Sequence, residues 1–159
     1  MDKKKLIEAI IVQLEKDLIA AKETAKVSRD AATNEESKPE NEYDTRALEA
    51  SYLAGAQSKR VTDIEDVISI YRFVQPKSFG PNEAISSTAL VEVDLDGRHS
   101  FLFLMSKGGG LSFDFEGKSI QIVTPSSPLG ETLLGLKAGD VAAVEIGSSV
   151  KEYEILSVS

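Results

Sequence analysis

The chain of 159 residues contains no cysteine and no tryptophan, and its one histidine is His99. Without cysteine, disulfides, thiolate metal sites and cysteine nucleophiles are excluded, which fits a reducing compartment. One histidine cannot form a histidine metal cluster, and a serine triad would depend on His99 alone. We therefore expect His99 to be an ordinary strand residue.

Long apolar runs are also absent. The start, Met1 to Ile7, has the lysines of a signal peptide, but Glu8, Gln13 and Glu15 interrupt the apolar stretch that follows. No run approaches the ~20 apolar residues that a membrane helix needs. We expect a cytoplasmic protein.

Basic residues are in the minority, with 18 lysines and arginines against 26 acidic residues and a net charge of -8. Binding to nucleic acid needs a basic face that displaces counterions from the phosphates. Any function that involves DNA or RNA should therefore require binding to a protein partner.

The triplet Gly108-Gly109-Gly110 lacks the context of a phosphate-binding loop and is predicted to form a loose hairpin turn.

Two stretches carry the apolar spacing of long helices. The first runs from Lys3 to about Ala32, and at ~1.5 Å per residue it would be roughly 45 Å long. Its apolar positions are Leu6, Ile10, Leu14, Leu18, Ala21, Ala25 and Ala32. The second begins after Ser37, where Ser37-Lys38-Pro39-Glu40 reads as a capping box. Its coiled-coil seam is Ala47, Ala50, Ala54, Gln57, Val61, Ile64, Ile68 and Tyr71.

The two helical stretches are predicted to form an antiparallel hairpin. If the chain folds back at Ser37, Ala25 and Ala32 lie opposite Ala47 and Ala50, and Ile10 lies opposite Ile64. Small residues then face small ones near the tip, and large aliphatic residues face each other near the base. The alternative is a pair of helices that dimerise between chains.

An acidic segment, residues 35–44, would form the tip of this hairpin. It holds five carboxylates and one lysine, a charge density that folding alone does not require. Mg²⁺ takes oxygen ligands and binds through one or two carboxylates plus substrate phosphates. A slender tip could deliver such ligands into the site of a partner, and the alternative is a solvated turn without function.

Prolines and glycine between Val74 and Asn82 mark a domain boundary, after which the apolar period changes to two. The alternating strands on either side of Asp96-Gly97 predict a hairpin. Ser127 can cap a short helix that starts at Pro128 and ends at Gly135. The fold class is therefore α+β, with an antiparallel coiled-coil hairpin before an antiparallel sheet crossed by one short helix. The predicted domains are 1–74 and 85–159, joined by a linker at 75–84.

Two segments resemble the bacterial Gre transcript-cleavage factors. Near the tip these are Glu40-Asn41-Glu42-Tyr43, Tyr52 and Gly55. In the C-terminal part they are the Ser127-Pro128-Leu129-Gly130 helix start, Gly139-Asp140 and the ending Glu152-Tyr153-Glu154-Ile155-Leu156. The resemblance implies an FKBP-like C-terminal domain that docks on RNA polymerase, with Ser126, Ser127 and Pro128 in the docking surface, while the hairpin enters the secondary channel.

The resemblance also implies that two tip carboxylates help the polymerase to hold a second Mg²⁺ and a water that hydrolyses the backtracked transcript. In this sequence the pair is assigned to Glu36 and Glu40, with Glu35 and Glu42 as spares, because the family's tip pattern does not align here without a gap. The protein would bind no cofactor alone, would not be an enzyme, and would be a monomer.

Three alternatives stay open. A channel-binding inhibitor would use the same surfaces without cleavage. A prolyl isomerase of FKBP type would need an aromatic pocket, whereas Phe101, Phe103, Phe113 and Phe115 fit a strand core. A dimeric coiled-coil scaffold would have no polymerase role.

Overall fold

A computed structural model describes residues 1–34 and 45–159. The chain forms two compact units. One comprises Met1–Ala9 together with Val74–Ser159, and the other comprises Ile10–Phe73. The first nine residues thus group with the C-terminal part, whereas the sequence division placed them in the hairpin domain.

Two helices, α1 (Lys3–Thr33) and α2 (Arg46–Phe73), account for the N-terminal half. Asp2 caps α1, because its carboxylate accepts hydrogen bonds from the backbone N–H groups of Lys4 and Lys5 at 2.9 and 3.3 Å. The predicted capping box at Ser37 and the acidic tip lie outside the described residues. No helix in the described ranges is long and apolar enough to cross a membrane.

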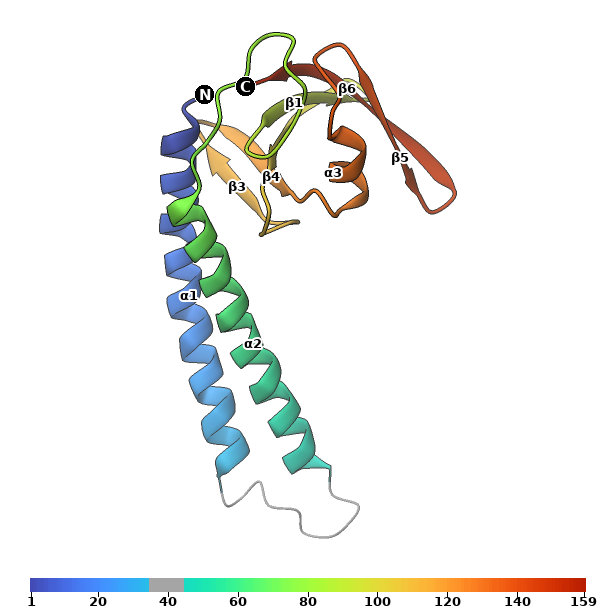
Figure 1. Ribbon diagram of the computed structural model, residues 1–159. Helices are drawn as coiled ribbons and strands as arrows, with labels where there is room; N and C mark the ends of the chain where they lie inside the picture. The colour runs from blue at the N-terminus through green and yellow to red at the C-terminus, as the bar shows by residue number, and fades with distance from the viewer. Residues whose placement is uncertain (35–44) are drawn as a thin grey trace. The chain divides into compact units, whose positions relative to one another are not determined.

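Within the hairpin unit the helices lie side by side and run antiparallel (Figure 1). Glu15 pairs with Arg72 at 2.5 Å and Lys22 pairs with Glu65 at 2.7 Å. A later residue of α1 thus pairs with an earlier residue of α2, as in an antiparallel pair. Every predicted seam position of α2 is buried or half-buried. The same holds for α1, whose fully buried seam includes Ile10, Leu14, Ala21 and Ala25. The predicted antiparallel pair is confirmed.

The predicted register of the two helices is wrong. Ala25 lines a cavity with Ser58, Val61 and Thr62 instead of facing Ala47. The pairing is displaced by several turns toward the C-terminal end of α2. Folding the chain at Ser37 ignored that α1 ends at Thr33 and α2 starts only at Arg46, which accounts for part of this displacement.

The C-terminal unit is built on one sheet whose order is β3-β4-β2-β1-β6-β5. Its strands are β1 (Leu90–Leu95), β2 (Arg98–Leu104), β3 (Ser112–Phe115), β4 (Lys118–Val123), β5 (Val141–Ile146) and β6 (Ser149–Val158). The helix α3 (Pro128–Leu133) comes between β4 and β5. Its capping residue and first helical proline were predicted from the sequence.

The sheet is mixed. Four of the five strand pairings in the described part of the chain are antiparallel, as predicted, but β2 and β4 are parallel. The predicted Asp96-Gly97 turn joins β1 to β2, with both residues at positive φ. Gly108-Gly109-Gly110 does not form the predicted hairpin turn. It connects β2 to β3, and β4 lies between these two strands.

The core of the C-terminal unit gathers apolar side chains from one face of the sheet and from α3. Its fully buried members are Ile85, Ala89, Val91, Val93, Leu102, Leu104, Val123, Leu133, Ala142 and Ile155. His99 lies on β2 and is exposed, with its imidazole nitrogens 3.5 and 3.4 Å from Glu92 and Asp94. It is a strand residue, as predicted.

Lys3 joins the start of α1 to residues 77–88 inside the same compact unit. Its ammonium group donates hydrogen bonds to the backbone oxygens of Lys77 and of Thr88, the latter at 3.1 Å, and lies 4.6 Å from the centroid of the Phe79 ring. Burial lowers the pKa of Lys3 from 10.5 to about 8, although the Glu83 carboxylate acts in the opposite direction. Thr88 is buried at positive φ, and its hydroxyl accepts from the N–H of Lys77.

Candidate partner-binding groove

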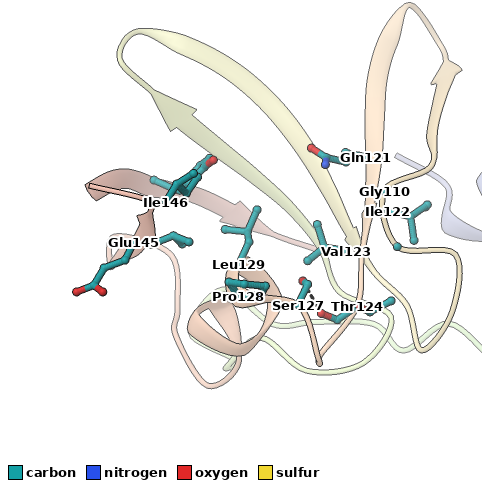
Figure 2. Close-up of a pocket in the computed structure, with 14 residues that line it drawn as sticks. Gly110, Gln121, Ile122, Val123, Thr124, Ser127, Pro128, Leu129, Glu145 and Ile146 are labelled. Atoms are coloured by element: carbon teal, nitrogen blue, oxygen red, sulfur yellow. Dashed lines mark hydrogen bonds between the residues drawn. The ribbon is translucent and has the colours of Figure 1, made fainter. Parts of the chain in front are cut away.

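A groove of about 700 Å³ opens on the core face of the C-terminal sheet (Figure 2). Four parts of the chain converge on it. They are the glycine connection after β2, the end of β4, the start of α3, and the β5–β6 hairpin. The lining residues are Gly109, Gly110, Gln121, Ile122, Val123, Thr124, Ser127, Pro128, Leu129, Val144, Glu145, Ile146, Gly147 and Tyr153.

One wall of the groove is the capped start of α3. The Ser127 hydroxyl accepts a hydrogen bond from the N–H of Gly130 at 3.1 Å and donates one to the backbone oxygen of Thr124 at 2.8 Å. Pro128 occupies the first turn, where its missing N–H has no helical partner. The Ser127 side chain is thus fully used in fixing the angle between β4 and α3.

Gly130 permits a close approach that no other residue allows. A Cβ atom at this position would lie 1.9 Å from the backbone oxygen of Thr124, which is far inside van der Waals contact. The chain can therefore turn tightly from β4 into α3, and this turn places Pro128 and Leu129 at the groove. Gly109 makes a milder approach on the opposite side, since its Cβ would meet Thr124 at 3.0 Å.

The other wall comes from β5 and β6. Val144 is buried, Tyr153 is half-buried, and Ile146 keeps 48% of its surface exposed at the rim. Glu145 is the one charged residue among those that line the groove in the described structure. Its side chain points away from the groove in Figure 2, so the groove presents apolar side chains, hydroxyl groups and the Gln121 amide.

The predicted docking residues lie at this groove. Ser127 and Pro128 line it, and Ser126 lies next to them with its hydroxyl oxygen 3.3 Å from that of Thr124. Ser126 and Pro128 are exposed and free to meet a partner, whereas Ser127 is half-buried and committed to the cap. The docking role of these three residues stays a prediction.

Sequence reasoning missed the opposite wall. The sequence did not single out Gln121, Val144, Glu145, Ile146 and Tyr153. The sequence of Val141–Ile146 gave no sign that this strand faces α3. The proximity of β5 to α3 depends on the order of strands in the sheet.

The predicted tip carboxylates, Glu35, Glu36, Glu40 and Glu42, lie outside the described residues. Elsewhere in the structure, within residues 1–34 and 45–159, no three histidine, cysteine or acidic side chains are grouped so that they could hold a metal ion. The predicted Mg²⁺ ligands therefore stay a prediction.

Comparison with known proteins connects the C-terminal segment to a family. Residues 113–159 match the family described as transcription elongation factor, GreA/GreB, C-terminal. The chain is 23% identical over 154 residues to the transcription inhibitor protein Gfh1 of Thermus thermophilus, which covers 95% of this chain and 91% of the relative. It is 25% identical over 105 residues to transcription elongation factor GreA of Thermotoga maritima, covering 65% and 63% of the two chains.

Solved structures of Gfh1 and of a GreA/GreB factor also align with this chain. The crystal structure of Gfh1 from Thermus thermophilus aligns with 98% of this chain and 94% of its own at 16% identity, with a TM-score of 0.38. A GreA/GreB factor from Nitrosomonas europaea aligns with 60% of this chain and 78% of its own at 20% identity, with a TM-score of 0.37. Residues 113–159 thus match the C-terminal part of the GreA/GreB family, and the chain is similar in sequence to Gfh1 along nearly its whole length.

Proposed function

We propose that this protein binds RNA polymerase and regulates transcript elongation from the secondary channel. The observation that carries the proposal is the similarity to named transcription factors, which extends from the GreA/GreB segment at residues 113–159 through 95% of the chain. Its net charge of -8 supports a route through a protein partner instead of direct binding to nucleic acid.

In this proposal the two units have separate tasks. The groove beside Ser126 and Pro128 docks on the polymerase at the mouth of the channel. The hairpin carries residues 35–44 into the channel. The 31 residues of α1 make a helix of roughly 45 Å, which is long enough to reach a buried active site.

The tip carboxylates would supply the chemistry. Glu36 and Glu40, with Glu35 and Glu42 as spares, would contribute oxygen ligands to a Mg²⁺ ion shared with the polymerase. That second metal ion supports attack of water on the transcript within the polymerase's own active site. The factor itself would hold no metal alone and catalyse no reaction.

A second candidate function is inhibition. It is favoured by one observation: the similarity to the transcription inhibitor protein Gfh1 spans 95% of this chain, whereas that to GreA of Thermotoga maritima spans 65%. An inhibitor would occupy the same channel through the same groove, and its tip would block the active site instead of assisting it.

Transcript cleavage in stalled elongation complexes separates the two candidates. A stimulating factor speeds cleavage, and Glu36→Ala combined with Glu40→Ala abolishes the gain while binding persists. An inhibitor slows cleavage or initiation. Glu23→Ala, on the exposed shaft of α1, is the matched control and should behave as the wild type. Absence of any effect at saturating protein contradicts both candidates.

We also propose that the protein works as a monomer in the cytoplasm.

A peptide isomerisation assay should give no rate above background, since the described groove holds Tyr153 as its one aromatic residue. A rate well above background would instead favour the isomerase alternative.

A further inference from the structure

One edge of the C-terminal sheet is open next to the groove. The strand β5 is the last in the sheet order, so only one of its sides pairs with another strand. Among the described residues, no backbone hydrogen bond outside the sheet involves residues 141–145. An unpaired row of N–H and C=O groups is a template for an additional strand.

The turn at Gly147 determines which residues of β5 face this open side. The two residues 147 and 148 join Ile146 to Ser149, and the pair that closes such a turn exchanges hydrogen bonds. Because bonded and unbonded pairs alternate, Ile146, Val144 and Ala142 direct their backbone toward β6. Val141, Ala143 and Glu145 therefore present their backbone groups outward.

This edge lacks the features that usually protect an edge strand. It has six residues in continuous register, no proline, no lysine and no bulge, and Val141 is 52% exposed. The opposite edge strand, β3, is shorter at four residues and carries Asp114 on an exposed position. The two edges thus differ, and only β5 borders the groove.

Side chains beside the open edge define what could bind there. The groove offers Val144, Ile146 and Leu129 to an apolar side chain, whereas Glu145 lies between Val144 and Ile146 along β5 and faces the other side of the sheet. Glu152 and Glu154 are the cross-strand partners of Ala143 and Val141, so they share a sheet face with Glu145. Three carboxylates on one face favour a basic occupant.

We propose that β5 accepts an extended segment of a partner protein as an added strand, with an apolar side chain in the groove and a basic side chain against Glu145. This mode of recognition takes its affinity from main-chain hydrogen bonds and its specificity from pockets for alternate side chains. It rests on the proposed docking role of the groove and names the chemistry of the segment that docks.

A second copy of this chain is the competing occupant. Pairing of β5 with β5 would bring two such acidic faces together, in a protein whose net charge is -8. A basic segment removes that repulsion, and we therefore assign the edge to a different protein.

The direct test uses the ¹⁵N-labelled full chain and a short synthetic peptide of alternating valine and lysine. The expected result is chemical-shift changes at Val141, Ala143 and Glu145, and none with a peptide in which glutamate replaces lysine. Ala143→Pro removes an outward donor without breaking the pairing with β6, and should weaken binding about tenfold or more. Glu145→Lys should weaken it as well, and Asp114→Lys, on the opposite edge strand β3, should change it about twofold at most.

Several outcomes overturn the proposal. They are shifts outside β5 and the groove, no shifts at millimolar peptide, and equal binding by folded Ala143→Pro and Glu145→Lys variants. A concentration-dependent dimer that Ala143→Pro abolishes would assign the edge to a second copy instead.

Binding to core RNA polymerase distinguishes failure of this inference from failure of the proposed function. If wild type and Ala143→Pro bind the polymerase equally, strand addition is wrong and the polymerase role stands. If the wild type does not bind the polymerase while the lysine peptide binds at β5, the polymerase role is wrong and the edge serves another basic partner.

Discussion

The hairpin unit and the C-terminal unit are stabilised in different ways. The hairpin has a single seam, which is fully buried at Ile10, Leu14 and Ile68 but only half-buried at Ala47 and Ala50. The C-terminal unit encloses a core to which several strands and α3 contribute. A substitution in a seam between two helices should affect mainly the neighbouring turns. A substitution in a core shared by distant segments should destabilise all of the strands that pack there.

The largest expected effect is in the C-terminal core. Leu133 is fully buried in that core, so Leu133→Ala should lower the free energy of unfolding by about 2–5 kcal/mol. Urea denaturation measures the loss, and hydrogen exchange should show it across the strands. A loss below about 1 kcal/mol would show that the site collapses around the cavity.

Gly130→Ala should have the next largest effect. The added Cβ would meet the Thr124 backbone oxygen, which cannot move aside as a flexible side chain would, so we expect a loss of about 1–3 kcal/mol. Thermal unfolding measures the loss, and shifted NMR signals of Ser127 and Pro128 would report the distorted groove. Wild-type stability in this variant would contradict the tight turn between β4 and α3.

Gly55→Ala should have the opposite sign. Gly55 lies inside α2, and a Cβ there would meet no atom within 4 Å. Removing a flexible glycine from a helix interior should therefore stabilise the hairpin by about 0.5–1 kcal/mol. Thermal unfolding followed by far-ultraviolet circular dichroism tests this, and a decrease in stability would show that the helix is strained at this point.

A pH-dependent effect is expected at Lys3. Its pKa is lowered from 10.5 to about 8, so between these values the unfolded chain binds more protons than the folded one. Stability should therefore rise with pH across that window. Compared with Lys3→Met, which does not titrate, the wild type should gain stability from pH 8 to pH 10.5, and Lys4→Met should follow the wild type. A relative loss would show that the hydrogen bonds and the Phe79 ring outweigh burial.

The smallest expected effect is at the exposed ion pair between Lys22 and Glu65, whose side chains are both about half exposed. Lys22→Gln should cost no more than ~0.5 kcal/mol, and the cost should disappear at high salt. Denaturation in low and high salt measures it. A cost above 1 kcal/mol would mean that this pair, and not the seam alone, holds the helices in register.

The same contrast explains what could be predicted from the sequence. Helical spacing identified both helices and every seam position of α2, because a helix is determined by neighbours three and four residues apart. The predicted register of the hairpin was wrong, since register depends on which turns of the two helices pack together and not on the spacing within either helix. Alternating strands and the Ser127-Pro128 cap were also found from local signals.

The order of strands was beyond the reach of local signals. Nothing in the residues of β4 indicates that it inserts between β2 and β3, since the pairing joins distant segments. The Ser127-Pro128 helix start, which forms one wall of the groove, was therefore predicted. The wall of Val144, Glu145 and Ile146 required the sheet order.

The proposed binding of this protein to RNA polymerase is tested most directly by co-elution with purified core enzyme. The full chain and the enzyme should elute together from a size-exclusion column at micromolar concentration. Separate elution of a folded protein, verified by circular dichroism, would contradict the account.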